Sequence, residues 1–284
     1  MSFNLVLEKV SKISPKDFKE EFLKPGVPVI IQGLTEGTGA AKKWTIDYFK
    51  STMGHYNVPL YDSRIKNPSS AYTQPNLHMR FGDFLDQISK NEETPYRMFL
   101  FNLFKLNPSL EKDFPCPDLA RGLLKELGYM FFAGKGTKVR NHFDLDMGNV
   151  FHTHFCGRKR ILLCSPEYSD FLYKLPLNSY SLVDLDKPDY LKYPAAKRIQ
   201  GYESILQEGE TLFIPSGYWH YITYLDPGFS VSYRKLPLKL SKKIEGILNI
   251  TLKLWADKIL AAGLGQNWLK WKEQTASRRA IKIS

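Results

Sequence analysis

The central part of the chain alternates short apolar segments with turn residues. Strand-length segments are predicted at 129–133, 138–145, 149–156, 159–164, 181–184, 199–206, 210–214, 218–224 and 229–234. Each such strand buries one face and needs a second sheet to cover it, so many short strands at this spacing favour a sandwich or a barrel. A jelly-roll type barrel is the expected closure.

The pattern before residue 129 mixes helical and extended segments. Helices are expected at 15–23, 44–53 and 119–127, and buried strands at 27–31 and 97–104. Thr45 is a plausible N-cap for the second helix and Gly54 a stop, because a hydroxyl can accept from a free backbone N–H and glycine often ends a helix. This part therefore adds helices and strands to the front of the barrel.

A different pattern begins after Pro237, where apolar residues recur at helical spacing. The stripe consists of Ile244, Ile247, Leu248, Thr251, Leu252, Trp255 and Ile259. Gly263 and Gly265 break this helix, and a second, shorter one begins at Trp268. So much apolar surface needs something to pack on. Packing on the outside of the barrel and a homodimer interface both remain open.

Length and composition fit one large core with helical additions, since 284 residues contain 43% hydrophobic and 14% aromatic side chains. We expect a mainly β fold with α additions: a double-stranded β-helix (jelly-roll or cupin) core over residues 1–237, with N-terminal α/β elements. Residues 238–284 form a C-terminal helical segment.

Charge and cysteine content narrow the class of protein less sharply. The formal net charge is +11, which favours anionic partners such as nucleic acid, acidic peptides or small dicarboxylates but does not choose among them. The three cysteines have no metal-ligand spacing and form no disulfide framework. No apolar run approaches the roughly 20 residues of a membrane span, and we see no secretory signal. A cytoplasmic setting is expected.

One group of residues carries candidate metal chemistry. His142 and Asp144 are two residues apart, so on a strand both would project from the same face. His220 follows a predicted strand and turn much later in the chain. Two imidazoles and one carboxylate leave coordination positions open, the arrangement used by non-haem Fe(II) oxygenases.

Around these residues the sequence resembles the cupin-like JmjC oxygenases, which include the asparaginyl hydroxylase of hypoxia-inducible factor and the tRNA wybutosine hydroxylase. The similarity is dense over residues 129–237 and looser over 25–104. It rests on His142-Phe143-Asp144, Gly157-Arg158-Lys159-Arg160-Ile161-Leu162-Leu163-Cys164-Ser165-Pro166, Val183-Asp184-Leu185-Asp186-Lys187-Pro188-Asp189-Tyr190, Gly201-Tyr202-Glu203, Ile214-Pro215 and Trp219-His220. The resemblance implies Fe(II), 2-oxoglutarate as co-substrate and O2, with succinate, CO2 and a hydroxylated product.

The family's site residues carry over by position. His142, Asp144 and His220 would be the iron ligands and catalytic centre, and Lys159 would pair with the far carboxylate of 2-oxoglutarate. The stretch between Asp144 and Gly157 is slightly longer than in the family, so Asn149 matches a family asparagine only if a bulge or turn absorbs the extra length.

Other positions depart from the asparaginyl hydroxylase. Phe99 and Val139 replace a tyrosine and a threonine of its co-substrate pocket and cannot donate those hydrogen bonds. His152 stands at a phenylalanine position, shares a strand face with His154, and could donate to a 2-oxoglutarate carboxylate. Arg234 is a second candidate carboxylate partner.

Three functions follow from these expectations. The first is an Fe(II)- and 2-oxoglutarate-dependent hydroxylase of a protein or peptide side chain. The second keeps this mechanism and makes the substrate RNA, because the chain is basic and has aromatics such as Tyr61, Tyr72 and Trp271 that could stack on bases. The third is a catalytically silent metal-binding barrel that recognises a partner.

Overall fold

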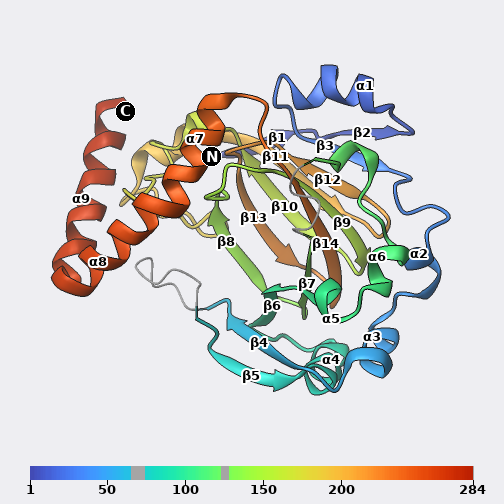
Figure 1. The fold of residues 1–284 in the computed structure, drawn as a ribbon. Helices are drawn as coiled ribbons and strands as arrows, with labels where there is room; N and C mark the ends of the chain where they lie inside the picture. Colours follow the sequence, from blue (N-terminus) through green and yellow to red (C-terminus); the bar gives the residue numbers. More distant parts are fainter. Residues whose placement is uncertain (65–73, 123–127, 284) are drawn as a thin grey trace.

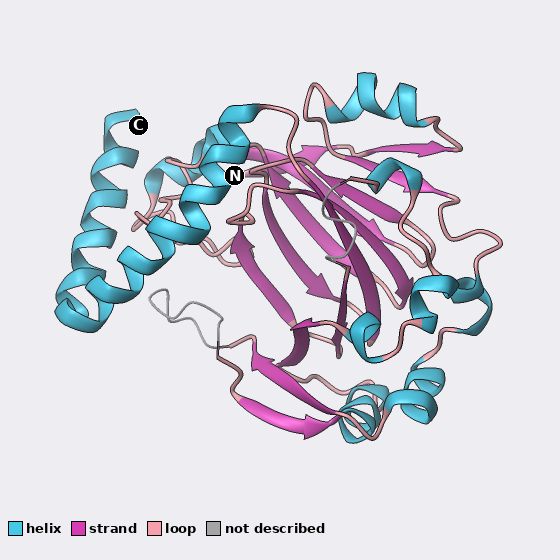
Figure 2. Ribbon diagram, viewed as in Figure 1, coloured by secondary structure: helices cyan, strands magenta, loops and turns pink. Residues whose placement is uncertain are grey.

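The fold is built on two β-sheets that face each other, with helices outside both (Figures 1 and 2). We analysed a computed structural model, which describes residues 1–64, 74–122 and 128–283. One sheet has five strands in the order β1-β11-β10-β13-β8. The other has nine, in the order β2-β3-β12-β9-β14-β7-β6-β4-β5. The expected fold class, a jelly-roll core with helical additions, is confirmed.

The strands occupy these ranges: β1 Ser2–Leu5, β2 Glu8–Ser11, β3 Val29–Gln32, β4 Asn57–Asp62, β5 Leu77–Arg80, β6 Tyr96–Phe101, β7 Tyr129–Ala133, β8 Lys138–His142, β9 Asn149–Cys156, β10 Lys159–Cys164, β11 Gln200–Leu206, β12 Thr211–Ile214, β13 Trp219–Tyr224 and β14 Gly228–Lys235.

The α-helices are α1 Pro15–Phe18, α2 Gly39–Lys43, α3 Ile46–Met53, α4 Phe81–Ser89, α5 Leu103–Leu106, α6 Ser109–Asp113, α7 Leu240–Leu248, α8 Leu254–Leu264 and α9 Gln266–Ile283. Two π-helical turns, η1 Lys19–Leu23 and η5 Asn249–Lys253, continue α1 and join α7 to α8, and three 3₁₀ turns lie at η2 Asp118–Ala120, η3 Pro166–Tyr168 and η4 Pro194–Arg198.

Strand alternation decides which residues face the space between the sheets. On β14, Phe229, Val231 and Tyr233 belong to the core under the N-terminal helices. Ser230 and Ser232 between them therefore point into the barrel, because successive side chains of a strand lie on opposite faces. The same alternation puts apolar residues of β9, β10, β12 and β13 into an interior cluster that joins both sheets. The barrel interior is thus apolar with a polar stripe.

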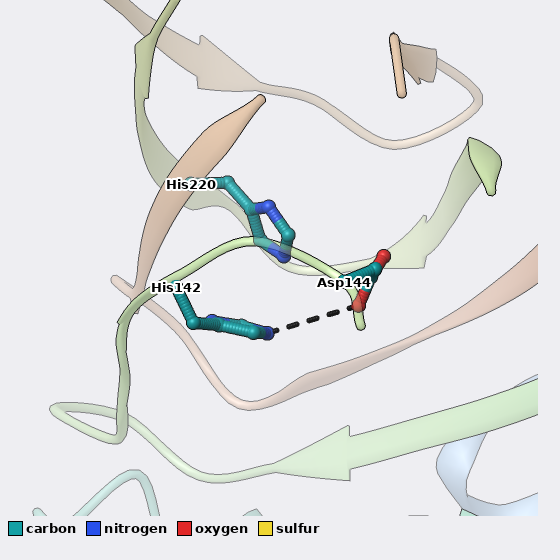
Figure 3. Close-up of side chains that lie close together, drawn as sticks. All are labelled: His142, Asp144 and His220. Carbon is teal, nitrogen blue, oxygen red and sulfur yellow. Dashed lines mark ion pairs between the residues drawn. The ribbon is translucent and has the colours of Figure 1, made fainter. Parts of the chain in front are cut away.

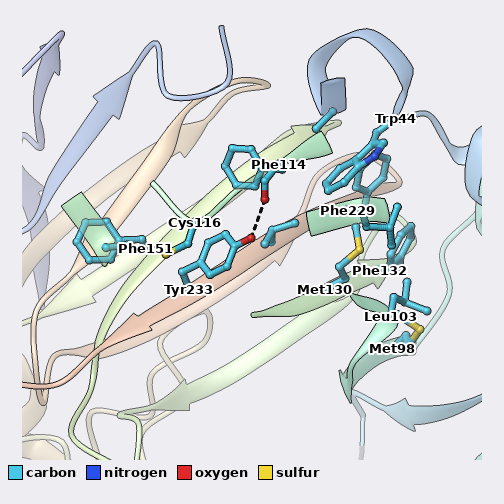
Figure 4. Close-up of a cluster of buried hydrophobic side chains, with 14 of the residues drawn as sticks. Trp44, Met98, Leu103, Phe114, Cys116, Met130, Phe132, Phe151, Phe229 and Tyr233 are labelled. Atoms are coloured by element: carbon cyan, nitrogen blue, oxygen red, sulfur yellow. Dashed lines mark hydrogen bonds between the residues drawn. The ribbon is translucent and has the colours of Figure 1, made fainter. Parts of the chain in front are cut away.

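An aromatic cluster covers the outer face of the nine-stranded sheet (Figure 4). The Phe132 ring stacks on the Phe229 ring at a centroid distance of 5.0 Å, and Phe49 of α3 packs edge-on against both. The Tyr233 hydroxyl donates to the carbonyl of Phe114 at 2.7 Å. These contacts hold the N-terminal helices on the sheet that carries β9 and β14.

Most predicted elements are confirmed, and most of the errors lie at element ends. The segments 129–133, 149–156 and 159–164 coincide with β7, β9 and β10, and Thr45 caps α3 by accepting from the Tyr48 N–H. The strand expected at 97–104 was too long, because β6 ends at Phe101 and α5 follows.

Two further predictions need correction. The segment 181–184 forms only an isolated bridge at Ser181 rather than a strand. The helix expected at 119–127 begins as the 3₁₀ turn η2, and its residues 123–127 lie outside the described part of the chain.

The C-terminal helices run along one end of the barrel (Figure 1). Gly263 does not break the helix, which continues to Leu264, so the break falls at Gly265 with its positive φ of 53°. Ala276 and Ala280 of α9 pack into the cluster outside the five-stranded sheet. The predicted stripe on α7 and α8 instead faces solvent, with Trp255 60% exposed.

Candidate metal centre

Three potential ligands converge at one end of the barrel interior (Figure 3). His142 ends β8, His220 lies opposite it on β13, and Asp144 follows in the turn after β8. One ligand atom from each of the three lies within 4.8 Å of the others. Within the described residues this is the only group of three or more His, Cys, Asp or Glu that could hold a metal ion.

Asp144 reaches this position differently from the sequence prediction. The strand expected at 138–145 ends at His142, so the carboxylate does not share a strand face with the imidazole. A shift in the pairing of β8 with β13, between His220 and Ile222, and the turn after β8 bring the side chains together instead. The grouping was predicted correctly, but the geometric reason given for it was wrong.

Hydrogen bonds to backbone carbonyls set the tautomer of both imidazoles, so that one nitrogen of each ring can bind a metal. His142 Nδ1 lies 2.7 Å from the carbonyl oxygen of Arg140, and His220 Nδ1 lies 3.2 Å from that of Tyr218. Since a carbonyl only accepts, each Nδ1 carries the proton and each Nε2 has a free lone pair. The hydrogen bond from Nδ1 to the carbonyl also fixes the orientation of each ring.

The electrostatics keep the three side chains in their ligand forms. Burial and the neighbouring His220 lower the pKa of His142 from 6.5 to about 3. Burial also lowers the pKa of His220. Burial alone would raise the pKa of Asp144, but the Arg234 guanidinium and the two imidazoles hold it well below its usual value. At neutral pH the group therefore offers two neutral imidazoles and one carboxylate.

A second polar cluster lies on the β9, β10 and β14 walls of the same interior. Lys159 is fully buried, and its Nζ lies 3.0 Å from His152 Nε2 and 2.5 Å from Ser230 Oγ. The ammonium also sits over the Tyr224 ring at 4.2 Å. No carboxylate among the described residues pairs with it, and burial lowers its pKa well below the usual value. A buried cation with no anion partner is costly, so this position fits an incoming carboxylate.

The direction of each hydrogen bond in this cluster can be derived. His154 Nε2 must donate to the carbonyl of Gly157, so its Nδ1 accepts from the Ser230 hydroxyl, which in turn accepts from Lys159. His152 Nε2 accepts from Lys159, and its Nδ1 donates to Ser232. In the charged form of Lys159 two N–H groups are thus engaged, and within the described part of the chain no hydrogen bond uses the third.

This arrangement gives His152 a different task from the predicted one. Both of its ring nitrogens are occupied, one by Lys159 and one by Ser232, so in this structure it orients the ammonium and donates nothing to an anion. Its direct contact with 2-oxoglutarate stays a prediction without support from these bonds.

Asn149 and Arg234, the other predicted co-substrate residues, are also committed elsewhere. Asn149 Oδ1 accepts from the Ser216 N–H at 3.0 Å. Its amide nitrogen lies 3.4 Å from each of the carbonyl oxygens of Lys235 and Leu236. Arg234 pairs with Asp144 at 3.0 Å and with Asp146 at 2.7 Å. Arg234 therefore lies next to the His142, Asp144 and His220 group rather than next to Lys159. Asn149 links the start of β9 to the turn before β13 and to the end of β14.

Phe99 and Val139, which differ from the tyrosine and threonine of the asparaginyl hydroxylase, lie on the barrel wall. Phe99 packs against Tyr61, with ring centroids 4.2 Å apart, and Val139 packs against the interior cluster. Neither side chain can donate a hydrogen bond. The polar contacts that these positions would supply in the resembling enzyme are therefore missing from these two residues.

Sequence reasoning missed Ser230, Ser232 and Asp146. Ser230 and Ser232 lie opposite His154 and His152 in the pairing of β14 with β9. Two serines alternating with apolar residues on a predicted strand were a readable signal for a polar stripe. No local pattern pointed to Asp146, because only the folded chain brings Arg234 of β14 next to the turn after β8 that contains Asp146.

Such a barrel, with a His-Asp-His group at one end and a buried lysine inside, defines the cupin-type metal-binding class. The family model described as "Cupin-like domain" matches residues 15–240. The chain belongs to this family, and the resemblance to JmjC oxygenases drawn from the sequence is confirmed.

The chain is also similar to individual curated proteins. Lysine-specific demethylase 8 of Danio rerio is 31% identical over 229 residues, which covers 76% of this chain and 55% of the relative. The Xenopus tropicalis protein of the same name is 30% identical, over 78% of this chain and 50% of its own. The tRNA wybutosine-synthesizing protein 5 of Gallus gallus is 25% identical, over 90% and 79%. The chain spans about half the length of the two demethylases.

The donor set fits the iron that JmjC oxygenases use with 2-oxoglutarate and O2. Two imidazole nitrogens and one carboxylate with open positions suit Fe(II), and both nitrogens here have their lone pairs free. Lys159, which forms no ion pair with any carboxylate of the described residues, fits a dicarboxylate in the same interior.

Proposed function

We propose that this protein is an Fe(II)- and 2-oxoglutarate-dependent hydroxylase that acts on a protein or peptide side chain. The observation that carries the proposal is the pair of sites in one barrel: a ligand group of His142, Asp144 and His220, and a buried Lys159 that has no acidic partner among the described residues. A dicarboxylate can use both, with one end at the metal and the other at the ammonium.

The side chains of this protein would do three things in the reaction. His142, Asp144 and His220 would hold the iron, which when bound supplies the redox chemistry. Lys159 would bind the far carboxylate of 2-oxoglutarate, positioned by His152 and Ser230. The apolar interior cluster would exclude water from the space between them.

The substrate class is inferred from the relatives. Two similar proteins are named lysine-specific demethylases, which refers to an amino-acid side chain. We therefore place a protein or peptide side chain first.

Succinate release tests the proposed activity. Anaerobically iron-loaded protein would be given 2-oxoglutarate, ascorbate and O2, with His142→Ala and Lys159→Met as variants. We expect succinate from the wild type, none from His142→Ala, and a raised KM for 2-oxoglutarate in Lys159→Met because the carboxylate loses its charged partner. Iron binding without succinate, even after candidate peptides are added, would instead support the catalytically silent barrel.

An RNA substrate with the same mechanism is the second candidate. It is favoured by the similarity to tRNA wybutosine-synthesizing protein 5, which covers more of both chains than the demethylase matches do, and by the net charge of +11. Of the three aromatics considered for stacking, Tyr61 is buried, Tyr72 lies outside the described residues, and Trp271 stacks on Trp268 at 4.6 Å. RNA binding that weakens steeply with salt, and RNA-stimulated succinate release, would move this candidate to first place.

We also propose a homodimer that uses the outer face of α7 and α8. Its exposed apolar residues are Leu240, Ile244, Ile247, Leu248, Leu252, Trp255 and Ile259. So many exposed apolar residues along one pair of helices are unusual on a monomer. A two-fold axis would bring the same patch of both subunits together and cover it. Light scattering after gel filtration should give a dimer mass for the wild type and a monomer mass for Trp255→Glu. A monomeric wild type would exclude this partner.

We further propose a cytoplasmic setting and a division of the chain into two parts. Cys116, Cys156 and Cys164 form no disulfide among the described residues, which suits a reducing cytoplasm. Among the described residues, none of the helices is both long and apolar enough to cross a bilayer. We keep residues 1–237 as the oxygenase domain and 238–284 as a helical segment. Limited proteolysis would test this division by showing whether the segment is released as a unit.

A further inference from the structure

The turn that carries Asp144 is held in place by residues from three distant parts of the chain. From β14, Arg234 reaches Asp144 and Asp146. From the turn between β12 and β13, the Ser216 hydroxyl donates to the carbonyl of Met147 at 2.6 Å. The third contact comes from the C-terminal helix. The position of the only acidic ligand therefore depends on tertiary contacts.

Asp146 shares the guanidinium of Arg234 with Asp144. Arg234 Nη1 lies 2.7 and 2.8 Å from the two oxygens of Asp146, while its Nη2 lies 3.0 Å from Asp144 Oδ1. The Asp146 carboxylate also accepts from the N–H of Gly148 at 3.1 Å. A planar guanidinium with two nitrogens engaged in this way has a fixed orientation, so it fixes the carboxylate of Asp144 as well.

The C-terminal helix formed by α7 and η5 contacts the same turn with its buried face. Asn249 Nδ2 donates to the carbonyl of Leu145 at 3.0 Å, and Asn249 is buried. Gly246 lies directly against the backbone of Asp146, so a Cβ at position 246 would overlap the Asp146 carbonyl oxygen. These contacts fall beyond residue 240, where the match to the cupin-like family model ends.

We propose that Arg234, Asp146, Gly246 and Asn249 are positioning residues, which together hold the Asp144 carboxylate in its metal-binding orientation and make the C-terminal helix part of the metal centre. This inference rests on the proposed metal site. It goes beyond the family's ligand set because it assigns a task to a segment outside the family match.

The charges explain why Asp146 is needed beside Arg234. A guanidinium paired with Asp144 alone would compete with a divalent cation for the same carboxylate oxygen. Asp146 is the second anion, which holds Arg234 by two close contacts and offsets its charge. Removing the Asp146 charge should therefore weaken metal binding both by loosening the turn and by strengthening the competition.

Two glycine substitutions test the contribution of the helix. Gly246→Ala would push the helix from the turn, whereas Gly263→Ala on α8 meets nothing within 4 Å and is the matched control. Alanine favours a helix over glycine at both positions, so loss of helix cannot explain a difference between them. Co(II) would be titrated into the metal-free protein, and the affinity and visible absorption bands recorded. We expect Gly246→Ala to bind Co(II) roughly 10- to 100-fold more weakly with altered bands, and Gly263→Ala to match the wild type.

Asp146→Asn tests the same proposal without touching the helix. Its control is Arg160→Gln, since Arg160 bridges Asp186 and Glu203 in a similar way outside the site. We expect a roughly 10- to 100-fold loss of Co(II) affinity in Asp146→Asn, and none in Arg160→Gln. Circular dichroism of each metal-free variant identifies any that fails to fold.

The possible failures can be told apart. Folded Gly246→Ala and Asp146→Asn proteins with wild-type Co(II) affinity and bands would overturn the positioning inference and leave the metal centre intact. Wild-type protein that binds no Co(II) would overturn both the inference and the proposed metal site.

Discussion

The barrel and the C-terminal hairpin of α7, α8 and α9 differ in the large side chains that they bury. In the barrel, large apolar residues such as Phe132 and Phe229 are fully buried. In the hairpin of α7, α8 and α9, the buried residues include Asp257 and Lys272, while Ile259 is 68% exposed. The hairpin therefore buries a charged pair as well as Trp268, Ala276 and Ala280, and it leaves the apolar residues of α7 and α8 exposed.

This difference indicates what each region is built to do. Burial of apolar area stabilises the barrel and makes a dry interior for the polar clusters. In the hairpin, Lys272 donates to both oxygens of Asp257 at 2.7 and 3.0 Å, and the Trp268 indole donates to the same carboxylate at 2.8 Å. Such a network fixes one arrangement of the helices.

The largest effect expected is acid destabilisation of the barrel. Burial lowers the pKa of His142, His152 and His154, so the folded protein cannot take up the protons that the unfolded chain binds below about pH 6.5. Stability is therefore complete above that pH and is lost as the pH falls. Three such imidazoles would cost roughly 5 kcal/mol between pH 7 and pH 5. Urea unfolding of metal-free protein would measure this, with the exposed His55→Gln as control. Stability that does not change between these pH values would contradict the prediction.

Truncating the barrel core should cost nearly as much. Phe132→Ala would remove a fully buried ring that contacts Phe49, Phe81 and Phe229. We expect a loss of about 3–5 kcal/mol in the free energy of unfolding, measured in urea. A loss below about 1 kcal/mol would mean that the aromatic cluster is not the stabilising core described here.

Breaking the buried ion pair of the hairpin is next in size. Asp257→Asn would leave Lys272 fully buried beside a neutral amide, at a cost of about 3 kcal/mol. Hydrogen exchange should show the loss in α8 and α9 before the barrel strands. The exposed pair of Lys24 and Glu20 is the control, and Lys24→Gln should cost less than about 0.5 kcal/mol. Equal effects in the two variants would show that the buried pair is not what holds the hairpin.

The smallest effect is expected on the outer face of the hairpin. Trp255 is 60% exposed, so Trp255→Ser should change the unfolding free energy of the monomer by no more than about 0.5 kcal/mol. Chemical unfolding at a protein concentration low enough to keep the chain monomeric would measure it. A loss of unfolding free energy like that of Phe132→Ala would show that the indole is buried within the monomer. The barrel and the hairpin would then not differ in this respect.

The chemistry of the site was readable from the sequence because it depends on residue type and order. His142, Asp144, His220 and Lys159 were all predicted, and the structure brings the first three together. The resemblance to the JmjC oxygenases pointed to Lys159 and His152, and the structure places both in the barrel interior. The predictions failed at element ends, as at residues 143–145, where β8 stops and a turn carries the ligand. Such ends depend on long-range pairing that local pattern does not encode.

The sequence by itself determined the strand periodicity, the ligand types and the amphipathic C-terminal helices, because each of these is a property of neighbouring residues. Only the tertiary structure decided that Arg234 pairs with Asp144 and that His152 contacts Lys159. It also decided that α7 meets the turn of Asp144 and Asp146 through Gly246. Partners such as these lie far apart in the chain, and only the folded sheets bring them within hydrogen-bonding or van der Waals distance.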